Sequence, residues 1–152
     1  MPIVGELGAT TLWMAICLAT YSGAGSIVGK IFGIYLLLES AKKSVYLLVL
    51  VLGVCTASLV GLFITRDFSI AYVAGHSNLA MDHIYTWVAF YAGNEGSLLY
   101  IAFILSVMAA LAVRFAPSRV RPTLPFSTAI MMVVLVFFLV VMAFMANPFA
   151  KL

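Results

Sequence analysis

Four long runs of uncharged, mostly apolar residues decide what this chain can fold into. They extend over about residues 7–29, 44–65, 97–113 and 123–146. Each approaches the roughly 20 apolar residues that a helix needs to cross a hydrocarbon layer about 30 Å thick. An exposed backbone amide in lipid costs several kcal/mol, and four segments cannot close a barrel. Each run is therefore predicted to be a transmembrane helix.

The composition excludes a water-facing globule. Hydrophobic residues make up 65% of the chain and charged residues 9%, whereas soluble domains average about 45–50% and about 25%. We therefore expect an all-α, polytopic membrane protein with about four transmembrane helices, folded as one transmembrane domain over residues 1–152. Cys17 and Cys55 fall within apolar runs and are expected to be free thiols. Without a Cys-x-x-Cys-His sequence, the chain is not itself a c-type cytochrome.

The Lys and Arg residues predict the orientation. Six of the eight lie in two connections on one side of the predicted bundle: Lys30, Lys42 and Lys43, and Arg114, Arg119 and Arg121. Short basic connections stay in the cytoplasm, so both termini and the outer loop 66–96 are predicted on the outer face. Glu6 stands where a signal peptide has its basic residues. The first run is therefore expected to remain in the protein.

Small residues at every fourth position predict close helix packing. Such rows let helix backbones approach each other in lipid, and we expect the first two helices to pack together through Gly25 and Gly53. The bulky fourth run suits a helix that faces lipid. The stretch 31–38 is either a helix extension or an interfacial segment. The rows are Ala15, Ala19 and Gly23; Gly25, Gly29 and Gly33; and Gly53, Ala57 and Gly61.

The outer loop 66–96 is the expected location of any functional site, because irregular connections of about thirty residues are usually functional. Its aromatic residues fit the belt that Trp and Tyr form at membrane interfaces. They are Tyr72, Tyr85, Trp87 and Tyr91.

His76 and His83 are the only histidines and are weak candidates for a ligand pair. Seven residues apart, they would share a face if the segment were helical, and two imidazoles can bind a metal or haem iron. With no third ligand in the sequence, ordinary loop histidines are the favoured interpretation. No metal site is predicted, no catalytic residue can be named, and no nucleic-acid partner is expected.

Three stretches, in this order and spacing, resemble the N-terminal part of CcmF, the membrane haem lyase component of cytochrome c maturation. The start, Glu6-Leu7-Gly8, fits the family too. The resemblance covers this whole chain but about the first quarter of a typical member. The stretches are Asp67, Phe68, Ser69, Ile70, Ala71, Tyr72, Val73 and Ala74 with Ser77 and Asn78; Asn94, Glu95, Gly96, Ser97, Leu98 and Leu99; and Asn147, Pro148 and Phe149.

The chain departs from the family pattern in two ways. Members usually show Trp-Gly-x-His-Glu-Gly-Ser where this chain reads Tyr-Ala-Gly-Asn-Glu-Gly-Ser over residues 91–97. The family's Trp-rich outer loop and its haem-ligating histidines lie downstream of the matched region, and His76 and His83 match none of those ligands. The resemblance therefore implies haem as a cofactor held by parts outside this chain.

The first functional hypothesis follows from the resemblance. The chain would be a scaffold in the cell inner (plasma) membrane that helps attach haem to apocytochrome c at the outer face. Its partners would be the remaining haem lyase part or other membrane maturation subunits, apocytochrome c and the lipid bilayer. A fragment, a split-gene piece and a diverged subunit remain open, and so does the question of enzymatic activity.

The alternative is a small non-enzymatic transmembrane subunit of a respiratory or photosynthetic complex. A neighbouring chain with the Trp-rich loop and outer histidines would favour the haem lyase. A stable complex without a haem-handling partner would favour the alternative.

Overall fold

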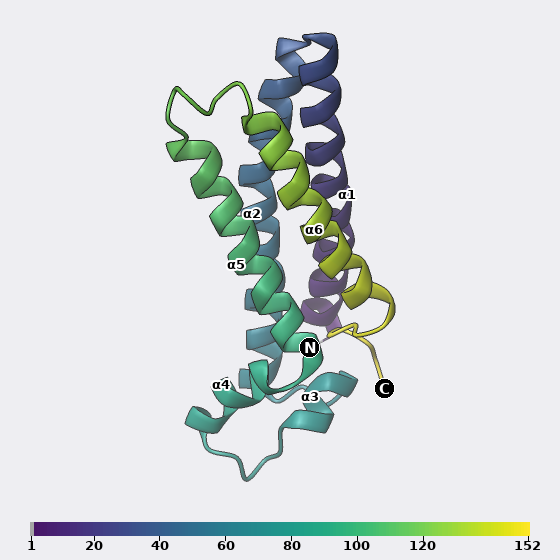
Figure 1. The fold of residues 1–152 in the computed structure, drawn as a ribbon. Coiled ribbons are helices and arrows are strands. Elements are labelled where there is room, and N and C mark those ends of the chain that lie inside the picture. The colour runs from purple at the N-terminus through teal and green to yellow at the C-terminus, as the bar shows by residue number, and fades with distance from the viewer. Residues whose placement is uncertain (1) are drawn as a thin grey trace.

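The computed structural model describes residues 2–152, which form a bundle of four long helices with two short helices at one end (Figure 1). All four long helices, α1, α2, α5 and α6, are long and apolar enough to cross a membrane. The predicted all-α class and the four spans are confirmed. The helices are α1 (Pro2–Phe32), α2 (Tyr35–Thr65), α3 (Ala71–His76), α4 (His83–Ala92), α5 (Asn94–Phe115) and α6 (Leu124–Phe144).

The connection between the first two helices is much shorter than the sequence indicated. Helix α1 continues to Phe32 and α2 begins at Tyr35, so Lys42 and Lys43 lie within a helix. The turn forms at Gly33, whose φ of +67° favours glycine. Stretch 31–38 therefore extends both helices. At 31 residues each they measure about 46 Å, against about 32 Å for α5 and α6.

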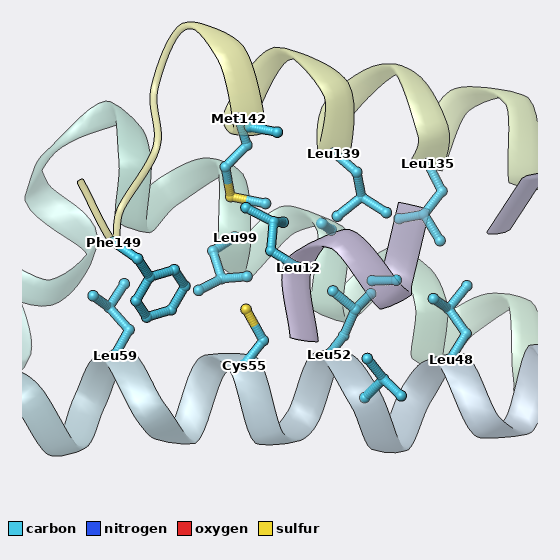
Figure 2. Close-up of a cluster of buried hydrophobic side chains, with 14 of the residues drawn as sticks. Leu12, Leu48, Leu52, Cys55, Leu59, Leu99, Leu135, Leu139, Met142 and Phe149 are labelled. Carbon is cyan, nitrogen blue, oxygen red and sulfur yellow. The ribbon is translucent and has the colours of Figure 1, made fainter. Parts of the chain in front are cut away.

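The core runs along the middle of the bundle. Helix α1 packs against α2 and α6, and α5 packs against the same two, so the four helices enclose one layer of side chains. Figure 2 shows leucines from all four helices meeting there, with Phe149 at one end beside Leu59 and Leu99. Met132, Leu135, Leu139 and Met142 of α6 are fully buried. One face of α6 thus lies in the core, whereas Ile130, Val133 and Phe137 on another face are more than 60% exposed, as suits a helix that also faces lipid.

The small-residue rows serve three different contacts. A Cβ built at Gly25 lies 3.5 Å from the Cβ of Ala41, so this row faces α2 as predicted. A Cβ built at Gly23 lies 3.1 Å from the Cβ of Met132 on α6. At Gly53 the nearest atom belongs to Phe103 of α5, at 3.6 Å. The expectation that Gly53 joins the first two helices is therefore wrong.

Candidate functional site

One end of the bundle is closed by a small structure that we call the cap: residues 66–97 and the C-terminal segment 147–152. It contains α3, α4 and the first turn of α5, and it lies at the end where both chain termini lie (Figure 1). The expected outer loop is thus a folded unit. Most of the residues that carry the family resemblance belong to the cap.

Arg66 fixes the loop that joins α3 to α4. It ends α2 in the left-handed conformation, with φ +54°, which is uncommon for a residue with a Cβ. Its guanidinium donates to the carbonyl oxygens of Leu79 and Met81 at 2.5 and 2.6 Å. Because both charge-assisted hydrogen bonds come from one planar group, they fix the distance of the loop from Arg66 and also its orientation. The loop is therefore tied back to the end of α2.

Tyr72 joins α3 to the break between α4 and α5. Its side chain is 4% exposed and stacks edge-on against Phe63 of α2, with ring centroids 5.3 Å apart. Its hydroxyl donates to the Phe90 carbonyl oxygen at 2.7 Å, near the end of α4. Burial raises the pKa of this hydroxyl above its usual value of 10. Tyr72 therefore stays a protonated donor, and the expectation that it belongs to the interfacial belt is wrong.

Two glycines let the backbone approach Tyr72. A Cβ at Gly93 would lie 2.5 Å from the ring of Tyr72, and one at Gly96 would lie 2.5 Å from its hydroxyl oxygen. The same atom at Gly96 would overlap the Phe90 carbonyl oxygen. Any side chain at position 96 would push the start of α5 away from the end of α4. Gly96 of the second motif thus meets Tyr72 of the first.

The third motif closes the cap from the other end of the sequence. Phe149 is 4% exposed and packs on α1 at Gly8, where a Cβ would overlap its ring. The Asn147 side-chain oxygen accepts from the Phe149 amide at 2.9 Å, which shapes the turn. Beyond it, Ile70 and Lys151 form an antiparallel bridge that joins this segment to the start of α3.

The remaining motif positions are polar groups of turns and helix ends. Asp67 accepts from the amide and hydroxyl of Ser69 at 3.1 and 2.6 Å. Ser77 donates to the Val73 carbonyl oxygen at 2.7 Å. The Asn78 side-chain oxygen accepts from the Ala80 amide at 3.1 Å, and the Ser97 hydroxyl donates to the Tyr91 and Gly93 carbonyl oxygens. Glu95 lies in the first turn of α5. Phe68 is half-buried and Pro148 is buried.

The two histidines lie on separate helices. His76 ends α3 and His83 begins α4, so the shared helical face on which a ligand pair depended does not exist. His76 Nδ1 lies 3.0 Å from the Tyr72 carbonyl oxygen, and its ring centroid lies 4.5 Å from that of Tyr72. Its Nε2 is directed at Gly93. His76 is therefore engaged within the cap, whereas His83 is exposed.

Over residues 2–152, no group of three or more His, Cys, Asp or Glu side chains is placed to hold a metal ion. The cap's described contacts join one segment of the chain to another, through Arg66, Tyr72 and Phe149. These contacts hold the cap together and against the bundle. Arg66 and Gly93 were missed as site residues, although an Arg directly after a span was a visible signal.

These observations define a class: a multi-pass helical membrane protein with a rigid cap at the end of the bundle where its termini meet. The sequence matches no protein-family model. It is 31% identical to the cytochrome c-type biogenesis protein CcmF of Pseudomonas aeruginosa, over 99% of this chain and 23% of the relative. It is 27% identical to CcmF of Escherichia coli, over 96% and 23%.

A solved structure gives the same result. The fold matches the structure titled cytochrome c heme lyase CcmF with a TM-score of 0.87 and 25% identity, over 99% of this chain and 25% of that one. The chain is therefore homologous to part of the CcmF-type cytochrome c biogenesis proteins. It spans about a quarter of their length.

Proposed function

We propose that this chain is the membrane scaffold part of a cytochrome c-type biogenesis haem lyase and helps attach haem to apocytochrome c. The observation that carries the proposal is the cap. Residues that resemble the family, dispersed from position 67 to position 149, come together there in one contact network. A chain whose family-like residues support one rigid surface fits a scaffold role.

In this role the chain supports the haem-holding region and does not itself hold the haem. Among the described residues, no group of three or more His, Cys, Asp or Glu side chains is placed to hold a metal ion, and these residues match about a quarter of a CcmF-type protein. The haem-holding region would then lie outside these 152 residues, in the remaining haem lyase part or in another membrane maturation subunit. The scaffold would position that region and the incoming apocytochrome c. When bound, haem would supply the vinyl groups that react with cysteine thiols.

The proposal also places the cap on the outer side of the cell inner membrane. The support is the asymmetry of Lys and Arg, since six of the eight lie in the α1–α2 hairpin, in the last turn of α5 and in the connection after it. All three lie at the end of the bundle opposite the cap (Figure 1). With the cap outside, its surface faces the compartment in which the proposed haem attachment takes place.

Deletion of the coding sequence in its host tests the proposal. We expect covalent haem in c-type cytochromes, detected by haem staining of denaturing gels, to be lost while the apocytochromes are still made. The wild-type chain and a Gly75→Ala variant should restore staining, because nothing lies within 4 Å of a Cβ at Gly75. Normal haem staining in the deletion strain would contradict the proposal.

A further inference from the structure

Helix α4 has an unusual surface for an element outside the spans. From His83 to Ala92 it contains no Asp, Glu, Lys or Arg. Thr86, Ala89 and Phe90 are buried against the bundle, yet the opposite face is also apolar. A helix that is apolar on all sides is normally buried in protein or membrane. At ten residues, about 15 Å, α4 is too short to cross a bilayer.

The exposed face of α4 has the composition of a membrane interface. Ile84, Trp87, Val88 and Tyr91 follow the i, i+3, i+4, i+7 spacing of one helical face and are 46–71% exposed. Trp and Tyr combine an apolar ring with one polar atom, which suits the headgroup level of a bilayer. The polar residues next to α4, Asn78 and Asp82, lie in the loop held by Arg66.

A groove between α4 and α5 continues this surface. It has a volume of about 520 Å³ and is lined by Trp87, Phe90, Tyr91, Ser97, Tyr100 and Ile101. Tyr100 and Ile101 belong to a span and are about half exposed. On the other side of α4, a smaller groove of about 150 Å³ reaches Val60 and Ile64 of α2. The apolar surface of α4 is thus continuous with the surfaces that two spans present to lipid.

We propose that α4 lies in the membrane interface and that the groove between α4 and α5 binds an acyl chain of a bilayer phospholipid. The groove is lined mainly by aromatic and aliphatic groups. The polar side-chain groups of its lining residues are the indole N–H of Trp87 and the hydroxyls of Tyr91, Ser97 and Tyr100. An acyl chain would enter along Ile101, from the hydrocarbon layer. This inference concerns lipid contact alone, so its failure would leave the proposed role in haem attachment untouched.

The chain has two tryptophans, which makes the test direct. In Trp13→Phe, Trp87 is the only tryptophan, and excitation beyond the tyrosine absorption band selects it. The full chain is placed in phosphatidylcholine nanodiscs with lipids brominated at successive acyl positions. We expect Trp87 to be quenched about twofold more by bromines near the headgroup than by deep ones, and weakly by acrylamide. Trp87→Phe is the control, because its remaining Trp13 lies within span α1 and should respond to deeper bromines.

A pair of charge variants in the Trp13→Phe background completes the test. Val88→Glu places a carboxylate on the proposed lipid face and should at least halve the quenching of Trp87 by shallow bromines. Leu79→Glu, in the polar loop, should leave it unchanged. Strong acrylamide quenching of Trp87 with no bromine effect would overturn the inference and point to water or a protein partner. Unaltered bromine quenching in Val88→Glu would overturn it as well.

Discussion

Gly96→Ala is the substitution for which the structure makes the sharpest prediction. The added Cβ would overlap the Phe90 carbonyl oxygen and lie 2.5 Å from the Tyr72 hydroxyl oxygen. A carbonyl is part of the backbone, so it cannot rotate away as the tip of a flexible side chain does. Helix α4 must move relative to α5. That movement stretches the 2.7 Å hydrogen bond between Tyr72 and Phe90.

Three contributions set the size of the effect. Alanine gains at most about 1 kcal/mol over glycine in a helix. Overpacking costs about 1–3 kcal/mol, and a buried hydroxyl left without its partner costs about 1–3 kcal/mol more. The net loss is roughly 1–5 kcal/mol. A chain of this size loses about 2–4 °C in Tm per kcal/mol. The Tm, measured in detergent by circular dichroism, should therefore fall by several degrees.

Gly75→Ala is the matched control, because Gly75 also lies in the cap and has no atom within 4 Å of its added Cβ. It should unfold at the wild-type temperature or slightly above. Tyr72→Phe supplies a second check: it removes one of the crowded atoms, so Gly96→Ala should cost less in that background. Equal Tm values for Gly96→Ala and Gly75→Ala would refute the packing described for the cap.

Three further predictions concern the span packing, the cofactor and the topology. Gly25→Leu should destabilise the α1–α2 pair by about 1–3 kcal/mol, measured as a lower Tm; an unchanged Tm would contradict the packing of that row. The purified chain should show no stoichiometric Soret band in a haem titration; a band that His76→Ala or His83→Ala abolishes would refute this. In a Cys17→Ala background, an impermeant thiol reagent should label Asn94→Cys from outside intact cells and leave Arg119→Cys unlabelled; the reverse would overturn the topology.

The spans were predictable because hydrophobic length is a property of the sequence alone. Their ends were not. Lys42 and Lys43 directly precede the second apolar run but do not mark the start of its helix, since long basic side chains are good helix formers. The backbone instead turns at Gly33, with its positive φ. The apolar residues 87–92 belong to α4 and not to the third span, and the break falls at Gly93, where a Cβ would lie 2.5 Å from the ring of Tyr72.

The sequence did not predict which helices the small-residue rows contact, or which segments meet in the cap. Spacing shows which residues share a helix face but not which neighbour that face meets. Gly53 accordingly contacts α5 rather than α1. The cap depends on contacts between distant segments, such as Phe149 on Gly8. The family resemblance identified these residues from the sequence, but it did not predict that they contact one another.

The departures from the family pattern can now be interpreted physically. Within residues 91–97 the chain differs from the pattern at Tyr91, Ala92 and Asn94, and all three are exposed. The positions that keep the pattern are Gly96, which is buried against the Phe90 carbonyl, and its neighbours Glu95 and Ser97, which are half-buried. Substitution of exposed residues leaves packing intact and alters what the surface can contact. The cap therefore retains the framework of the CcmF-type fold, while the surface it presents beside α4 differs from the family's usual one.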